Sequence, residues 1–303
     1  MSDVLGDLGD ALEVLRGREL VVEELGGGLT NHNYRVRTDD GGDYVVRVSE
    51  TSTGLLAINR ANERANTTTA WHSGVGAPVV ESLPERDVLV VGFLTGRTLT
   101  SHDVSDPDTI VRIAASLRKL HGGGDFQGEF DMRRIRRYYL SVVQERGFRL
   151  PEEYLDLQAR VEELEDAMRP GDEPLVPCNN DLLAANFIDD GDHMWIIDYE
   201  YSGMNEASFE LGNVASESGL DDAATAQLVE CYWGRASQHK LARAQAWSLL
   251  ARYGWTLWAS IQDGSSTIDF DFWSWGMAKY TSARDELLGP RFGELVEGLA
   301  AQD

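Results

Sequence analysis

Two carboxylates and one amide, close together in the chain, have the types and spacing needed for phosphoryl transfer. Asp181 is followed five residues later by Asn186, and Asp198 lies a further twelve residues on. In phosphoryl transfer to an alcohol, an Asp accepts the proton of the attacking hydroxyl, and an Asn five residues later binds a metal ion. Mg²⁺ prefers carboxylate and amide oxygens together with phosphate oxygens. The spacing predicts Asp181 as the catalytic base and Asn186 and Asp198 as magnesium ligands.

Short strands around a tight turn must position these three side chains. The apolar residues 187–188 precede Asp190-Gly191, a pair typical of a hairpin turn, and the apolar run 194–197 leads directly into Asp198. Asp198 is therefore expected at a strand end, facing the loop that carries Asn186. The alternative is that these are ordinary loop residues, because Asp and Asn are common in loops, but the surrounding strands and turn favour the catalytic interpretation.

A second candidate region combines a glycine-rich turn with a cation on the following strand. Gly27, Gly28, Thr30 and Asn31 lie between two predicted strands, where backbone N–H groups can approach phosphate oxygens. The alternative is an ordinary flexible hairpin. Arg47 stands in the apolar strand 44–48 and needs a partner if it is buried, unless it lies on an exposed edge. Glu63, in a helix predicted over 57–72, is the candidate partner of a phosphate-orienting cation.

A third region, near the end of the chain, is rich in aromatic residues. Trp255 and Trp258 are three residues apart on a predicted helix and therefore share a face. Aromatic faces attract cations, and cages of them bind quaternary ammonium groups. A plain aromatic core is the alternative. The other candidates for such a cage are Tyr201, Phe270, Trp275 and the carboxylate Glu217.

The elements predicted along the chain divide it into two parts. Residues 1–95 read as an antiparallel sheet with one long helix, preceded by a short helix over 4–16. Residues 96–303 read as mostly helical, with the loop of Asp181 inserted between helices. We therefore expect an α+β, two-lobed fold, with a nucleotide-binding lobe over 1–95 and a helical lobe over 96–303. The predicted helices of the second part span 106–121, 131–146, 151–168, 207–218, 221–234, 238–262, 269–287 and 290–301.

The composition limits the possible partners. The chain has 303 residues, 42% of them hydrophobic, and a formal net charge of −24. So negative a chain is not expected to bind nucleic acid or an anionic membrane. Only 3 of its basic residues are Lys and 24 are Arg, and this pattern with abundant Asp and Glu predicts a halophilic protein, because salt screens self-repulsion.

The cysteines and the hydropathy pattern point to a cytoplasmic protein. Cys178 and Cys231 form neither a disulfide framework nor a metal-ligand cluster. The N-terminal residues lack the basic and apolar regions of a signal peptide, and no stretch approaches the roughly 20 apolar residues of a membrane span.

Taken together, these segments resemble the choline/ethanolamine kinase family, within the aminoglycoside-phosphotransferase-like and protein-kinase-like folds. The resemblance covers about residues 25–284. It rests on GGLTNHNYRV, YVVRVS with INRANE, NNDLLAANF, IIDYEYSGMNEASFELGNVASE, and WTLWASIQ followed by IDFDFW.

The resemblance implies roles for the candidate residues. Asp181 matches the catalytic base, Asn186 and Asp198 match the Mg²⁺ ligands, and Arg47 with Glu63 matches the pair that orients the phosphates of ATP. The positions of Tyr201, Glu217, Trp255, Trp258, Phe270 and Trp275 match the choline pocket, where the last is commonly Tyr. The family usually has His-Asn-Asp in its catalytic loop, whereas this chain has Asn at position 179.

The predicted function is transfer of the γ-phosphate of MgATP to the hydroxyl of a small amino alcohol. Choline is favoured over ethanolamine, because a quaternary ammonium offers no hydrogen-bond donors and needs only aromatic faces and charge. The alternatives are a kinase of aminoglycosides or sugar alcohols and a non-catalytic protein that binds nucleotide or a quaternary ammonium solute. The sequence does not specify the oligomeric state.

Overall fold

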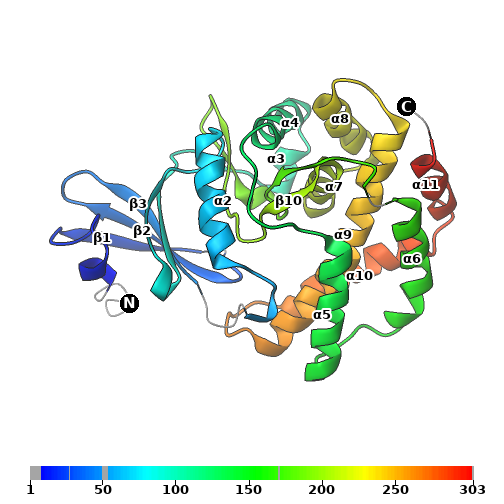
Figure 1. The fold of residues 1–303 in the computed structure, drawn as a ribbon, viewed down its shortest axis with the longest axis horizontal. Coiled ribbons are helices and arrows are strands. Elements are labelled where there is room, and N and C mark those ends of the chain that lie inside the picture. The colour runs from blue at the N-terminus through cyan, green and yellow to red at the C-terminus, as the bar shows by residue number, and fades with distance from the viewer. Residues whose placement is uncertain (1–7, 27, 50–53, 170, 302–303) are drawn as a thin grey trace.

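The computed structural model describes residues 8–26, 28–49, 54–169 and 171–301, which fold into two lobes (Figure 1). The first lobe contains a five-stranded sheet in which every neighbouring pair is antiparallel. The strand order is β1 (Leu20–Leu25), β2 (Asn31–Thr38), β3 (Asp43–Ser49), β5 (Val88–Gly92) and β4 (Val79–Leu83), with the 3₁₀ turn η2 (Pro84–Arg86) between β4 and β5.

Alternating side chains of the sheet build the core of this lobe. In β2, Tyr34 and Val36 are buried whereas His32 and Arg37 are exposed, as expected for a strand with one covered face. The buried face packs against leucines from the start of the chain, in the cluster Leu8, Leu12, Leu15, Tyr34, Val36, Val46, Val88 and Val90. Only residues 8–11 of the predicted helix 4–16 are helical, residues 13–17 form turns, and residues 4–7 lie outside the described part.

Helix α2 (Arg60–His72) connects the two lobes. Asn59 caps it by accepting from the backbone N–H groups of Ala61 and Asn62, so the helix starts later than the predicted residue 57. Its buried Asn66 donates to the backbone oxygens of Gln127 and Ser202, which belong to the second lobe. These bonds fix the helix that carries Glu63 against the helical lobe.

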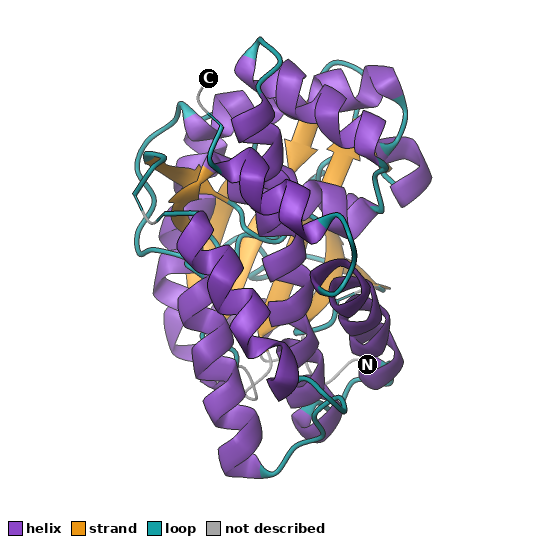
Figure 2. Ribbon diagram, turned by 90° about the vertical axis from the view of Figure 1, so that its right-hand side faces the viewer, coloured by secondary structure: helices purple, strands orange, loops and turns teal. Residues whose placement is uncertain are grey.

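The second lobe is built around the long helix α9 (Gln238–Ser265), which packs against α5, α7, α10 and α11. Figure 2 views the molecule from this lobe and shows helices in front of the strands. Among the described residues, no helix is both long and apolar enough to cross a bilayer. The other helices are α3 (Ser101–Val104), α4 (Pro107–His121), α5 (Met132–Arg146), α6 (Gln158–Ala167), α7 (Ala207–Ser218), α8 (Asp222–Trp233), α10 (Phe272–Leu287) and α11 (Phe292–Leu299).

The predicted helix 151–168 is only partly correct. Residues 151–154 are not helical, and Glu153 has a φ of +64°, a left-handed conformation that an α-helix does not accommodate. The 3₁₀ turn η3 (Leu155–Leu157) then leads into α6.

Two small antiparallel sheets carry the loop of Asp181. The first pairs β7 (Leu175–Cys178) with β10 (Gly203–Glu206). The second has the order β6 (Arg97–Thr98), β8 (Phe187–Asp189) and β9 (Met194–Ile196), and the 3₁₀ turn η4 (Ala184–Asn186) precedes β8. The two-lobed α+β fold predicted from the sequence is confirmed, whereas the division at residue 95 stays a prediction.

Candidate active site

The loop after β7 is held by two asparagines that precede Asp181. The side chain of Asn179 accepts from the backbone N–H of Asp181 at 3.0 Å and donates to the backbone oxygens of Ile197 and Asp198 at 3.1 and 2.8 Å. Asn180 takes a left-handed φ of +69°, and its N–H donates to Glu210 of α7 at 2.8 Å. Asn179 therefore ties the Asp181 loop to the strand end that carries Asp198.

Asn186 and Asp198 lie where two neighbouring cavities of the protein adjoin. The amide of Asn186 donates to the backbone oxygen of Asp181 at 2.7 Å, which leaves its side-chain oxygen for another partner. Asp198 follows β9 with a left-handed φ of +64°. Both residues line the cavity beside Arg47 and the cavity beside Asp181. One amide oxygen and one carboxylate at such a junction form a donor set that fits Mg²⁺ bound to phosphate oxygens.

The larger of these two cavities has the shape and lining expected of a nucleotide site. Its volume is about 410 Å³, and it lies between the sheet of the first lobe and a wall formed by η4, β8 and the loop after β9. Apolar side chains can face a base, while Arg47, Asn186 and Asp198 lie where phosphates and metal are needed. The apolar walls are Leu25, Val45, Ala77, Leu89, Val91, Phe93, Leu94 and Ile188.

Arg47 is the centre of a buried ionic network. Its guanidinium contacts Glu63 at 2.6 Å and Asp198 at 2.5 Å. Arg60, one turn before Glu63 on α2, contacts Glu63 at 2.7 Å and Glu200 at 3.2 Å. The pair predicted from the sequence is thus in contact, and the exposed-edge alternative for Arg47 is wrong because its side chain is only 12% exposed.

Glu200 connects this network to the glycine-rich turn. Thr30 and Asn31 donate to its two carboxylate oxygens at 2.7 and 2.8 Å, so their side chains point into the protein. Burial and the nearby Asp198 raise the pKa of Glu200 to about 7. Gly28 lines the cavity, and a Cβ there would lie 2.3 Å from the backbone oxygen of Asn31, so only glycine fits. Gly27 lies outside the described residues.

The smaller cavity, about 90 Å³, has aromatic walls and Asp181 at its lining. Tyr201 accepts from the Trp258 ring N–H at 2.8 Å and packs edge-on against Trp255, with ring centres 5.2 Å apart. Trp258 and Trp275 also pack edge to face, at 5.4 Å. The structure thus brings together five of the predicted acceptor residues, Tyr201, Glu217, Trp255, Trp258 and Trp275.

Phe270 is the predicted acceptor residue that does not line this cavity. Its side chain is 41% exposed and packs against Phe272 at the start of α10, with ring centres 4.9 Å apart. The predicted helix over 269–287 begins only at Phe272, after Asp271 caps its first turn, so Phe270 lies in the preceding loop.

The electrostatic environment of Asp181 suits a group that takes up a proton. Burial has the largest effect, and the negative charges of Asp198 and Glu200 add to it, so the pKa of Asp181 lies well above its usual value. A raised pKa makes a carboxylate a stronger base.

Three charged residues of the site were not predicted from the sequence: Arg60, Glu200 and Lys279. Arg60 and Glu200 stand three residues before Glu63 and two after Asp198, so proximity in the chain could have pointed to them. Lys279 donates to both carboxylate oxygens of Glu217 at 2.7 Å. The sequence could have pointed to Lys279, because it stands four residues after Trp275 on the same predicted helix and therefore shares its face.

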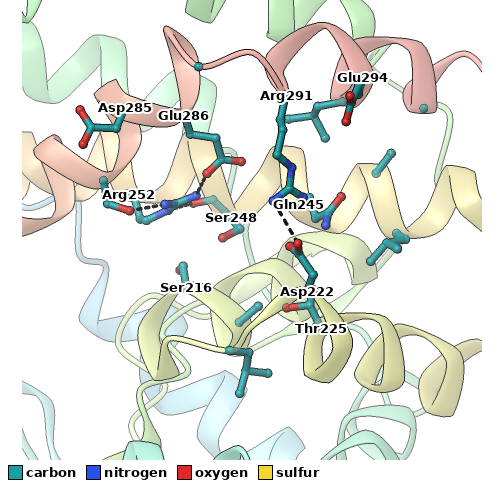
Figure 3. A pocket seen from close by; sticks show the side chains of 18 of the residues that line it. Ser216, Asp222, Thr225, Gln245, Ser248, Arg252, Asp285, Glu286, Arg291 and Glu294 are labelled. Carbon is teal, nitrogen blue, oxygen red and sulfur yellow. Dashed lines mark hydrogen bonds and ion pairs between the residues drawn. The ribbon is translucent and has the colours of Figure 1, made fainter.

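A further cavity of about 700 Å³ lies between α7, α8, α9, α10 and α11 (Figure 3). Arg252 donates to Glu286 there at 2.5 Å, and Arg291 contacts Asp222 at 3.0 Å. No predicted site residue is among the described residues that line it. The groups suited to phosphoryl transfer therefore gather at the two smaller cavities.

Comparison with known proteins agrees with this arrangement. A family model described as choline/ethanolamine kinase matches residues 22–241. Ethanolamine kinase 2 of Rattus norvegicus is 27% identical over 263 residues, covering 78% of this chain and 68% of the relative.

Solved structures show the same likeness. A choline/ethanolamine kinase family protein of Mesorhizobium loti superposes with a TM-score of 0.86 at 27% identity, covering 98% of each chain. The choline kinase LicA of Streptococcus pneumoniae gives 0.78 at 24%, covering 94% of this chain and 97% of the other. Aminoglycoside phosphotransferases share the fold, with a TM-score of 0.62 and 13% identity for an ADP-bound example.

Proposed function

Because the chain belongs to the choline/ethanolamine kinase family, and is thereby an ATP-dependent kinase of small molecules, we propose that its acceptor is choline and its product phosphocholine. The observation that carries this proposal is the aromatic cavity beside Asp181, with Trp255, Trp258 and Trp275 around it. Trimethylammonium has no N–H donors, so it is bound best by aromatic faces and a nearby negative charge.

The proposed reaction places the two substrates in the two adjoining cavities. The nucleotide occupies the 410 Å³ cavity, with Arg47 near its phosphates, and the acceptor enters the 90 Å³ cavity. Asp181 orients the acceptor hydroxyl and takes its proton as the oxygen attacks the γ-phosphorus, while the bond from that phosphorus to the β,γ-bridging oxygen breaks and ADP leaves. Asn186 and Asp198 would hold Mg²⁺, which neutralises phosphate charge when bound. Catalysis then depends on placement and charge neutralisation.

A specific contact favours ethanolamine as the second candidate. Glu217 already accepts two hydrogen bonds from a primary ammonium, that of Lys279, at 2.7 Å. The ammonium of ethanolamine can make the same bonds, whereas that of choline cannot.

Phosphorylation of choline, ethanolamine and no acceptor, followed in molar KCl with MgATP, tests the proposal. We expect phosphocholine to form preferentially, and Asp181→Asn to abolish it while keeping the shape of the side chain. Preferential phosphorylation of ethanolamine would establish the second candidate. A folded protein that binds ATP and phosphorylates neither amine would overturn both and direct the search to other alcohols.

A further inference from the structure

Lys279 places a cation of the protein beside the acceptor cavity. Its ammonium nitrogen lies 2.7 Å from each carboxylate oxygen of Glu217 and 4.2 Å from the centre of the Trp275 ring. The side chains of Lys279 and Glu217 are 11% and 4% exposed. A carboxylate and an aromatic face suited to a substrate cation are therefore already engaged.

The backbone fixes this arrangement. Trp275 and Lys279 are four residues apart on α10, so they share one face of the helix. Glu217 comes from the last turn of α7, and both of its carboxylate oxygens accept from the Lys279 ammonium. An ion pair with so little exposed surface is weakly screened by salt.

Two consequences follow for an acceptor that enters the cavity. Glu217 is neutralised, so a cationic acceptor gains little from it and is repelled by Lys279 unless it displaces that ammonium. The cavity is also small, about 90 Å³, where ligand sites are commonly about 300 Å³ or more. Movement of Lys279 away from Glu217 would free both charge and space.

We propose that Lys279 is a specificity-determining residue, the resident counter-cation of Glu217, which weakens the binding of cationic acceptors relative to neutral alcohols of the same shape. This inference rests on the proposed function of the cavity. Removal of the Lys279 ammonium should favour cationic acceptors whether a substrate cation displaces Lys279 or shares Glu217 with it. In both cases the removal leaves an uncompensated negative charge on Glu217 that attracts the substrate cation.

The test compares choline with its neutral carbon analogue, 3,3-dimethylbutan-1-ol, as acceptors. In Lys279→Met we expect the ratio of kcat/KM for choline to that for the analogue to rise about tenfold, and in Glu217→Gln to fall by a similar factor. Lys240→Met is the matched control, because Lys240 also lies over a tryptophan, Trp233 at 4.4 Å, and near a carboxylate, Glu173 at 3.9 Å, but neither of these partners lines the acceptor cavity, whereas Glu217 and Trp275 do. An unchanged or lower ratio in Lys279→Met would overturn the inference.

A binding measurement separates this inference from the proposed reaction. The chain has only three lysines, so ¹³C,¹⁵N-lysine labelling gives a simple NMR spectrum, in which the Lys279→Met variant identifies the Lys279 signal. We expect choline to shift that signal saturably and to leave those of Lys119 and Lys240 in place. The shift without turnover would refute phosphorylation of choline but support the role of Lys279. No shift at the highest soluble choline concentration would overturn the role of Lys279, even if turnover is seen.

Discussion

The nucleotide side and the acceptor side of the site are built on different physical principles. On the nucleotide side, Arg47 lines the cavity and begins a continuous network of buried charges that runs through Glu63 and Arg60 to Glu200, at the wall of the acceptor cavity. On the acceptor side, three tryptophans and a tyrosine surround a much smaller space, and carboxylates line it as well, among them Glu217, which is paired with Lys279.

The difference reflects the ligands that each side is proposed to take. A polyphosphate requires fixed cations and hard oxygens, and a closed network holds Arg47 in one orientation before the nucleotide arrives. A small organic cation requires aromatic faces and local negative charge. Beside the acceptor cavity, Lys279 is a cation that a substrate cation could replace directly at Glu217.

The largest effect is expected at Asp181, where the two sides meet. Asp181→Asn removes the proposed base but keeps the hydrogen bonds of the loop backbone, so kcat should fall by about 10³- to 10⁴-fold. Binding of ATP and of choline, measured by calorimetry, should persist. A fall of kcat smaller than about tenfold would contradict the role of Asp181 as the base.

A change on the acceptor side should leave the nucleotide side intact. Trp255→Leu removes one aromatic face, and we expect kcat/KM for choline to fall by about 30-fold while the KM for ATP stays within twofold. The matched control is Trp273→Leu, because Trp273 stacks on Arg149 at 3.9 Å and does not line the cavity. Equal losses in both variants would mean that Trp255 serves only the packing of the lobe.

A substitution in the ionic network should lower the stability of the protein and weaken its use of ATP. Glu200→Gln deprives Arg60, Thr30 and Asn31 of a charged acceptor, so we expect the free energy of unfolding to fall by about 3 kcal/mol and the KM for ATP to rise about tenfold. Urea unfolding and ATP kinetics measure these changes. Glu163→Gln, which breaks an exposed pair with Arg160, should alter the free energy of unfolding by less than about 0.5 kcal/mol. If both variants lose the same stability, the network is not structurally important.

The smallest effect is expected from salt, and it should act on the whole chain rather than on one side. With a net charge of −24, transfer from molar KCl to low salt should lower the midpoint of thermal unfolding by about 2 °C, equivalent to about 1 kcal/mol. Scans across a KCl series measure this. A midpoint that does not change would contradict the prediction of a halophilic protein.

The sequence by itself determined the fold class and the family, and it predicted which residues carry the catalytic chemistry. The Asp181, Asn186 and Asp198 spacing is local, because the loop, hairpin and strand that position it lie within eighteen residues. Arg47 and Glu63 could be paired because an apolar strand tolerates a cation only with a partner. Helix ends were less predictable, since caps such as Asn59 and Asp271 decide them. Phe270 was assigned to the aromatic cavity from its residue type and the family resemblance, neither of which shows which way an exposed loop side chain points.

Beyond the Arg47–Glu63 pair, only the tertiary structure decided which charges meet. Glu200 receives donors from Thr30 and Asn31, about 170 residues earlier in the chain, and this contact turns two predicted nucleotide residues inward. Lys279 pairs with Glu217, which lies 62 residues earlier in the chain, and no local sequence pattern predicts an ion pair between two separate helices. Residue types and short spacings specify which chemistry is possible, whereas long-range packing specifies which of those groups remain free for a substrate.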